Sequence, residues 1–143
     1  MATWTDEAVA LREGLAVWCE ALSAGHVDAD AGAEFPRDKW KLVQESGLLG
    51  LPLDEEWGGL GQDLLTTMYV LEGLGEGCRD GGLSFCVTTH MVSTGVALQA
   101  FGSDHLKRTY LPRVAAGDAI GAHAITEPQG GSDALQMLTR AVR

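Results

Sequence analysis

The sequence is poor in cysteine, histidine and basic residues, and each shortage narrows the functions it can have. Its 143 residues include three cysteines, four histidines, and 10 Lys and Arg against 20 Asp and Glu. The cysteines form no CxxC pair and the histidines are scattered, so no zinc-site spacing is present and no metal is expected. Cys19, Cys78 and Cys86 lie in apolar or helical contexts, which favours buried free thiols.

The shortage of positive charge disfavours two classes of partner. A net charge of −10 argues against nucleic acid, since affinity for nucleic acid comes mainly from phosphate neutralisation by Lys and Arg. The same charge argues against an anionic membrane surface. A ligand that carries phosphate remains possible, because backbone N–H groups bind phosphate without net positive charge.

Long apolar runs are also missing. No run approaches the roughly 20 residues that a membrane-spanning helix needs. The first ten residues, MATWTDEAVA, lack the basic and apolar regions of a signal peptide. We therefore expect a protein of the reducing cytoplasm, and its 45% hydrophobic residues are enough to fill the core of a domain of this length.

What the sequence does contain is helical periodicity over most of its length. Residues 5–24 place apolar side chains along one helical face, with Thr5 as a plausible N-cap and Gly25 as the stop. A polar loop is expected after Gly25. Further helices are predicted from Pro36 to Gly47, over 64–76 behind Asp63, over 83–101 with a break near 93–95, and from Ser103 up to Pro112.

The last 25 residues have a different character. Residues 120–125 (IGAHAI) and 137–143 (MLTRAVR) are predicted to be strands. Two short strands joined by a long loop leave their edges unpaired and cannot stand alone in water. The sequence thus predicts a mainly α fold followed by the opening of a β-structure, which either pairs with chain outside this sequence or is poorly ordered.

Between the two predicted strands lies TEPQGGSD, residues 126–133. Pro128 restricts the backbone, Gly130 and Gly131 permit close approach of a ligand, and Thr126 and Ser132 supply hydroxyls. Successive free N–H groups in such a loop can bind a pyrophosphate. The same residue types also build ordinary turns, and composition alone favours a plain turn over a ligand site.

Three stretches together resemble the acyl-CoA dehydrogenase family. GDAIGAHAITEPQGGSD is similar to the family signature, and LLGLPLDEEWGGLGQD and FGSDHLKRTYLPRVAAGD are similar to two earlier family segments in the same order and spacing. The resemblance covers essentially the whole chain. It implies that residues 1–118 form the N-terminal helical bundle and that residues 119–143 begin the middle β-domain, with its first one or two strands and its flavin-binding loop.

The resemblance also implies flavin chemistry. Members of the family use FAD to oxidise the Cα–Cβ bond of an acyl thioester, with a carboxylate base from a later helical region that this sequence does not contain. Glu127 is therefore interpreted as structural, satisfying loop backbone groups, and no catalytic residue is assigned. Ser132 is expected to lie near the thioester as well as the flavin. The expected flavin contacts are His123, Ile125, Thr126, Gly131 and Ser132.

The resemblance also implies three kinds of partner. These are an acyl thioester on coenzyme A or an acyl-carrier protein, an electron acceptor such as a flavoprotein, and further copies of this protein in a dimer or tetramer. Alone, the 143-residue chain is expected to be inactive. Two alternatives stay open: a non-catalytic helical subunit or fragment that docks on a larger dehydrogenase-like partner, and a flavin oxidase or monooxygenase of the same fold.

A few other residues admit both a functional and a structural interpretation. His90 could face the acyl pocket, but a satisfied core or surface histidine is the favoured interpretation. Arg108 and Arg113 could meet a phosphate, although a solvated helix face fits them better. The four tryptophans are interpreted as packing anchors.

Overall fold

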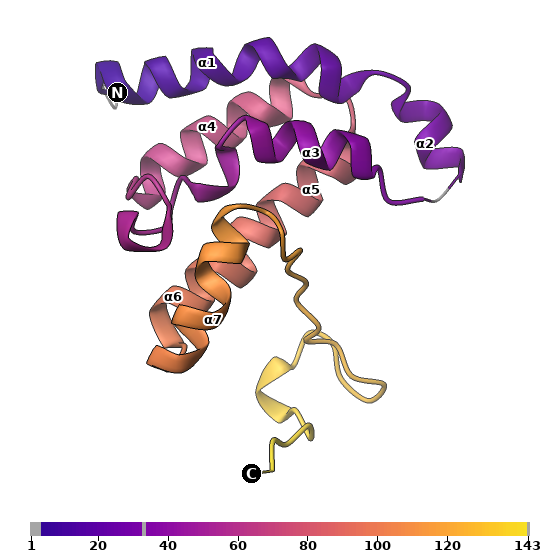
Figure 1. Ribbon diagram of the computed structural model, residues 1–143. Helices are drawn as coiled ribbons and strands as arrows, with labels where there is room; N and C mark the ends of the chain where they lie inside the picture. The colour runs from indigo at the N-terminus through magenta and orange to yellow at the C-terminus, as the bar shows by residue number, and fades with distance from the viewer. Residues whose placement is uncertain (1–3, 33, 143) are drawn as a thin grey trace.

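The structure, a computed structural model, describes residues 4–32 and 34–142, and helices make up most of this range (Figure 1). The prediction of a mainly α fold is confirmed. In chain order the elements are α1 (Asp6–Ser23), α2 (His26–Gly32), α3 (Arg37–Glu45), the 3-10 turns η1 (Leu48–Gly50) and η2 (Glu55–Trp57), α4 (Leu64–Gly77), α5 (Gly81–Thr88), the π-helix η3 (Thr89–Val96), α6 (Ala97–Phe101), α7 (Asp104–Ala115) and the 3-10 turn η4 (Ala134–Gln136).

Two helix starts follow from side chains that cap the first turn. The Thr5 hydroxyl accepts the Ala8 N–H at 3.1 Å, and the Asp63 carboxylate accepts the Thr66 N–H at 2.7 Å. Each cap satisfies an N–H group that has no partner within its own helix. Because a cap is a local interaction, the sequence alone locates it, and the helices predicted over 5–24 and 64–76 correspond to α1 and α4 within a residue at each end.

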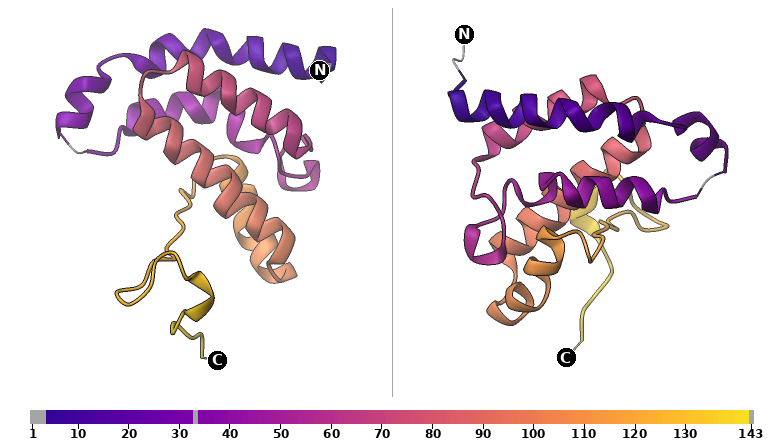
Figure 2. Two further views of the ribbon diagram at one scale, coloured as in Figure 1. Left: turned by 180° about the vertical axis from the view of Figure 1, so that it is seen from behind. Right: turned by 45° about the horizontal axis from the view of Figure 1, so that its top comes forward.

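The main core lies where α1 packs against α3 and α4 (Figures 1 and 2). Leu22 of α1 and Val43 of α3 have no exposed surface, and Leu74 of α4 is 1% exposed. Burial of these apolar side chains supplies the driving force for packing the three helices. The buried residues of this core are Leu15, Cys19, Leu22, Trp40, Val43, Leu48, Leu49, Leu51, Val70, Leu71, Leu74, Cys78, Leu83, Val87 and Met91.

Helical periodicity predicts that Leu64, Met68, Leu71 and Leu74 lie along one inward stripe of α4, and this is only partly right. Leu71 and Leu74 are buried as expected, whereas Leu64 and Met68 are 59% and 47% exposed. The buried face of α4 is centred on Thr67 and on the positions a turn further along, so the first two members of the predicted stripe lie to one side of it.

Helices α5, η3 and α6 follow one another without interruption from residue 81 to residue 101, and α7 packs against η3 and α6. The break predicted near residues 93–95 is therefore wrong. The chain continues there as the π-helix η3, in which Gly95 is buried. A Cβ on Gly95 would lie 3.3 Å from Leu53 Cδ2, so this glycine serves close packing instead of ending the helix.

Two further expectations are corrected. Residues 26–32, predicted to be loop, form the short helix α2, none of whose described residues is buried. Pro112, predicted to limit the last long helix, lies inside α7, which continues to Ala115. Proline removes one helical N–H, whose partner here would be the carbonyl of the exposed residue Arg108, and water can satisfy a carbonyl at such a position.

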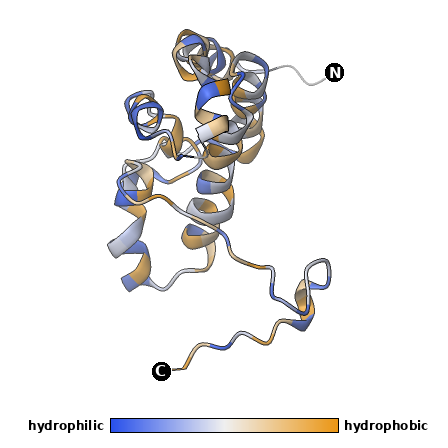
Figure 3. Cartoon of the chain, turned by 90° about the vertical axis from the view of Figure 1, so that its right-hand side faces the viewer, coloured by the Kyte–Doolittle hydropathy of each residue, from blue (hydrophilic) through white to orange (hydrophobic). Residues whose placement is uncertain are grey.

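Neither predicted strand forms within the described residues. Residues 119–142 leave the helical part as an irregular segment in which polar and apolar residues are mixed (Figure 3). Within this segment, β-type backbone pairing is limited to one isolated bridge, between Glu127 and Gly130. A strand needs a neighbour for its N–H and C=O groups, and the described chain offers none to residues 120–125 or 137–142; residue 143 lies outside the described range.

Leu74→Ala is expected to lower the free energy of unfolding by about 2–5 kcal/mol, because it leaves a cavity in a closed core. The matched change Leu65→Ala, on the same helix at a residue that is 61% exposed, is expected to cost less than about 0.5 kcal/mol. Urea denaturation followed by circular dichroism measures both. Equal losses would contradict the assignment of the core.

Candidate functional site

The chain leaves the helical part at a point held by side chains from α3. The indole N–H of Trp40 donates to the Gly117 carbonyl at 2.9 Å, and the Gln44 amide donates to the Ala116 carbonyl at 3.0 Å. Gly117 has φ +76°, in the left-handed region, and a Cβ there would lie 2.5 Å from Leu49 Cδ1. Residue 117 must therefore be glycine for both reasons, and the direction of the following segment is set at this turn.

His90 makes a further contact with this segment, at Gly121. Its side chain is fully buried in η3, with Nε2 at 2.8 Å from the Val114 carbonyl and Nδ1 at 3.0 Å from the Gly121 backbone nitrogen. Since the Gly121 N–H can only donate, Nδ1 accepts, and the ring proton is on Nε2. The favoured interpretation of His90 as a satisfied core histidine is confirmed.

Burial lowers the pKa of His90, because the charged imidazolium is disfavoured away from water, and the bond to the Val114 carbonyl opposes this shift in part. The Trp40 ring meets the imidazole edge-on, with ring centroids 5.3 Å apart. His90 therefore stays neutral at physiological pH and serves as one donor and one acceptor.

Glu127 organises the loop within the segment. Its carboxylate accepts the backbone N–H groups of Leu138 and Thr139, both at 2.8 Å, and the Thr139 hydroxyl. The Leu138 N–H is the main cause of the lowered pKa of Glu127, followed by the Thr139 hydroxyl and the Thr139 N–H. The interpretation of Glu127 as a structural residue that satisfies loop backbone groups is confirmed.

The five expected flavin contacts lie on one exposed stretch of this segment. Side chains of His123, Ile125, Thr126 and Ser132 are exposed, and Gly131 is exposed as well. A Cβ on Gly131 would lie 3.9 Å from Thr126 Cγ2, which shows that these two residues face each other across the loop. Among the described residues no other element covers this stretch, and the loop itself brings Thr126 and Gly131 together.

Gly130 and Gly131 occupy positions where the turn itself does not require glycine. Neither belongs to the glycines with positive φ, and a Cβ at either residue would meet only ordinary van der Waals contacts, at 3.8 Å and 3.9 Å. An alanine would thus fit the loop as it stands. Composition alone had favoured a plain turn, but the geometry removes the usual reasons for glycine in one.

Hydrogen-bonding groups around these glycines are free. Within the part of the chain that the structure describes, the N–H groups of Thr126, Gly131 and Ser132 and the hydroxyls of Thr126 and Ser132 have no protein partner. Exposed donors on a loop whose shape is fixed by Glu127 are suited to an anionic or polar ligand.

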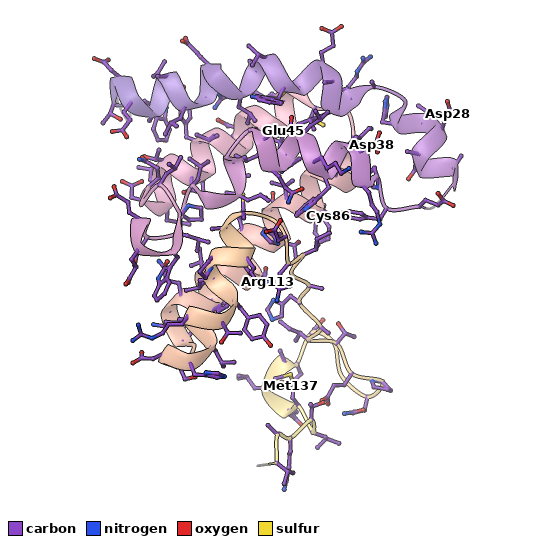
Figure 4. All side chains as sticks on the ribbon, viewed as in Figure 1. Asp28, Asp38, Glu45, Cys86, Arg113 and Met137 are labelled. Carbon is purple, nitrogen blue, oxygen red and sulfur yellow. The ribbon has the colours of Figure 1, made fainter. Side chains whose placement is uncertain are left out.

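The remaining candidates have structural surroundings. Arg108 and Arg113 are exposed on α7, as a solvated face requires. Figure 4 shows Arg113 within the helical part, while Met137 lies on the segment that extends away from it. Trp4 stacks on Tyr69 with centroids 4.0 Å apart, in agreement with its interpretation as a packing anchor.

Sequence reasoning missed the residues that hold the segment. Nothing in the pattern of α3 distinguishes Gln44 from any polar residue of a helix, and Gly121 looks like part of a strand. Their partners are far away in the sequence, 72 residues for the Gln44 bond to Ala116 and 31 for the Gly121 bond to His90. Only a contact prediction could have found them.

Two kinds of feature are absent from the described residues. In the ranges 4–32 and 34–142 no helix is both long and apolar enough to cross a bilayer. The same ranges contain no group of three or more His, Cys, Asp or Glu side chains placed to hold a metal ion. The three cysteines are free thiols; Cys19 and Cys78 are buried as expected, whereas Cys86 is only half-buried.

Comparison with known proteins identifies the family. The family model for the acyl-CoA dehydrogenase N-terminal domain matches residues 5–118, which contain every helix from α1 to α7. The chain belongs to the acyl-CoA dehydrogenase family. The resemblance seen in the three sequence stretches is confirmed.

Two curated proteins illustrate the similarity. An L-prolyl-(peptidyl-carrier protein) dehydrogenase of Pseudomonas fluorescens is 38% identical over 107 residues, 75% of this chain and 28% of that protein. The probable acyl-CoA dehydrogenase YngJ of Bacillus subtilis is 36% identical over 140 residues, 96% of this chain and 36% of that protein. The chain therefore spans about a third of the length of these relatives.

Solved structures agree with this family. The crystal structure of the prolyl acyl carrier protein oxidase AnaB matches with a TM-score of 0.86 and 35% identity, covering 94% of this chain and 36% of that one. The FAD complex of PigA matches with a TM-score of 0.86 and 30% identity, covering 96% of this chain and 36% of that one.

The loop around Glu127 is expected to lose its order in acid. Because the folded pKa of Glu127 lies below its ordinary value, the stabilisation is complete above that ordinary value and is lost as pH falls through the lowered folded pKa. The backbone amide signals of Leu138 and Thr139 should report this transition in an NMR pH titration.

Glu127→Gln should speed hydrogen exchange at the same two amides at neutral pH, because a neutral amide oxygen is a weaker acceptor than a carboxylate. Glu20→Gln, at an exposed residue of α1, is the matched control and should leave both amides unchanged. Equal exchange in Glu127→Gln and the unaltered chain would show that the carboxylate does not order the loop.

Proposed function

We propose that this chain is the N-terminal part of a flavin-dependent acyl-thioester dehydrogenase and that its loop 126–133 forms part of the FAD site. In this proposal residues 1–118 are the helical domain and residues 119–143 begin the middle β-domain. The rest of the flavin site and the catalytic base lie on chain beyond this segment, so the 143 residues alone are inactive.

The observation that carries the proposal is the glycine pair without a structural need for glycine. Gly130 and Gly131 have neither positive φ nor crowded surroundings, so the missing Cβ atoms leave room for something outside the loop. Free N–H groups and hydroxyls flank that room. Backbone that a ligand approaches closely needs these properties.

Local charge is compatible with a cofactor that carries a pyrophosphate. Residues 119–143 contain two carboxylates and two arginines, so the large negative charge of the chain is located elsewhere. Glu127, one of these carboxylates, is already bonded to Leu138 and Thr139. An anionic ligand at the loop would meet little net repulsion.

The loop would hold FAD, which would supply the acceptor for the β-hydride of the acyl group, while the α-proton would go to the carboxylate base on later chain. The hydroxyls of Thr126 and Ser132 would donate to polar groups of the flavin and its phosphates, with the backbone at Gly131 beside them. His123 and Ile125 would line the flavin from the preceding stretch. Ser132 would also lie against the thioester, and orientation of the thioester there is the part of the chemistry assigned to this chain.

The proposed substrate is an acyl thioester carried by coenzyme A or by a carrier protein. The relative from Pseudomonas fluorescens acts on a prolyl group held by a peptidyl-carrier protein, which supports the second carrier. An electron acceptor such as a flavoprotein and assembly into dimers or tetramers belong to the same proposal. A flavin oxidase is the second candidate, because AnaB is a prolyl acyl carrier protein oxidase.

The protein purified from its natural source should show the visible absorption of oxidised flavin and should bleach when its acyl thioester is added. Persistent bleaching in air supports a dehydrogenase, whereas rapid recovery with formation of hydrogen peroxide supports the oxidase. A colourless protein that takes up no added FAD would contradict the proposal and favour a non-catalytic subunit.

Thr126→Val in the flavin-containing protein is expected to raise the FAD dissociation constant about tenfold or more, since it removes a hydrogen bond to a charged or polar ligand group but keeps the side-chain shape. Thr109→Val, at an exposed threonine of α7 whose hydroxyl bonds its own helix, is the matched control. Fluorescence titration of the apoprotein with FAD measures both. Equal dissociation constants would place the cofactor elsewhere.

A further inference from the structure

His90 joins three parts of the molecule that are far apart in the sequence. It belongs to η3, it is bonded to the Val114 carbonyl near the end of α7, and it is bonded to the Gly121 N–H on the segment that leaves the helical part. The ring of Trp40 on α3 lies edge-on against it. A fully buried imidazole thus occupies the junction between the helices and the loop segment.

The Gly121 bond is the last hydrogen bond that ties this segment to the helical part. Beyond it, within residues 122–142, the hydrogen bonds stay inside the segment, as in the pairing of Glu127 with Gly130 and of Gln136 with Asp133. Figure 1 shows that the segment then runs clear of the helices. Whatever fixes Gly121 therefore fixes the origin of the loop.

Gly121 is also held on a second side by the same helix. A Cβ on residue 121 would lie 2.5 Å from three side-chain atoms of Thr94, so only a glycine brings its N–H this close to η3. His90 and Thr94 are four residues apart on η3, and both contact Gly121. The neighbouring residues Ile120 and Ala122 are exposed, which leaves Gly121 as the residue in contact.

We propose that His90 is a positioning residue: in its neutral form with the proton on Nε2, it holds Gly121 against η3 and so sets where residues 123–132 lie. The consequence for FAD rests on the function proposed above. The contact between His90 and Gly121, called the tether below, does not depend on that function, because both residues belong to the described chain.

The two ring nitrogens have separable tasks, and two amide side chains imitate them one at a time. The Oδ1 atom of asparagine is two bonds from Cβ, as Nδ1 of histidine is, so His90→Asn keeps an acceptor for the Gly121 N–H. The Nε2 atom of glutamine is three bonds from Cβ, as Nε2 of histidine is, so His90→Gln keeps a donor for the Val114 carbonyl. Each variant loses one bond of the pair.

Hydrogen exchange in the 143-residue chain distinguishes positioning from core filling. We expect the Gly121 amide to exchange about tenfold faster in His90→Gln than in His90→Asn, after correction for the free energy of unfolding of each variant. The Ala116 amide, bonded to the Pro112 carbonyl inside the helical part, is the internal control and should not show this difference. Equal corrected rates at Gly121, or faster exchange in His90→Asn, would overturn the proposal.

The unaltered chain gives a second test that needs no variant. The ¹⁵N signals of His90 should show a protonated Nε2 and an unprotonated Nδ1 at neutral pH, with a coupling across the bond from the Gly121 N–H to Nδ1. A proton on Nδ1, or a His90 signal that averages between tautomers, would overturn the tether even if both variants fail to fold.

The effect of His90 on FAD binding is measured separately, in the flavin-containing protein. The FAD dissociation constant should rise more for His90→Gln than for His90→Asn. If Gly121 exchange separates the variants but their FAD affinities are equal, the tether is upheld and the location proposed for FAD is wrong. If Gly121 exchange does not separate them, the positioning role is wrong whatever the FAD result.

Discussion

The hydrogen bonds that hold the chain just after α7 govern everything that follows it. Trp40 and Gln44 of α3 bind the carbonyls of Gly117 and Ala116, and His90 of η3 binds Gly121 four residues later. The Trp40 bond is buried and the His90 bond is partly buried, and there an unpaired backbone group would be costly, whereas the Gln44 bond is exposed. The helical part therefore acts as a frame, and the position of the loop segment is determined by contacts made before the loop begins.

In the loop 126–133, some residues stabilise the loop itself and others are available to a ligand. Glu127 has an internal task, since its carboxylate collects N–H groups from Leu138 and Thr139 and gives the loop its shape. Gly130 and Gly131 have no internal task that requires glycine. Composition alone suggests a catalytic role for the carboxylate and a turn for the glycine pair. The surroundings of these residues instead indicate a structural role for Glu127 and room for a ligand at Gly130 and Gly131.

The helical part has buried apolar clusters of its own, but the loop segment has none. The described helices and turns bury two clusters of apolar side chains, whereas residues 119–142 make few contacts beyond Gly121 (Figure 3). The chain spans 28% and 36% of the two curated relatives compared with it. In a protein of this family, a loop that is ordered but uncovered is consistent with a shared site whose other walls come from elsewhere, and we propose that arrangement here.

Local interactions are what the sequence by itself determined: the caps at Thr5 and Asp63, the apolar periodicity of α1 and the family motifs depend on residues within a few positions of one another. The π-helix in place of a break, Pro112 inside α7, and the lack of strands in residues 120–125 and 137–142 depend on what packs or pairs with them, so local patterns gave the wrong answer. The tertiary structure alone decided the task of His90. Its two partners lie 24 and 31 residues away along the chain, and no local pattern encodes a contact that exists only once the helices have packed.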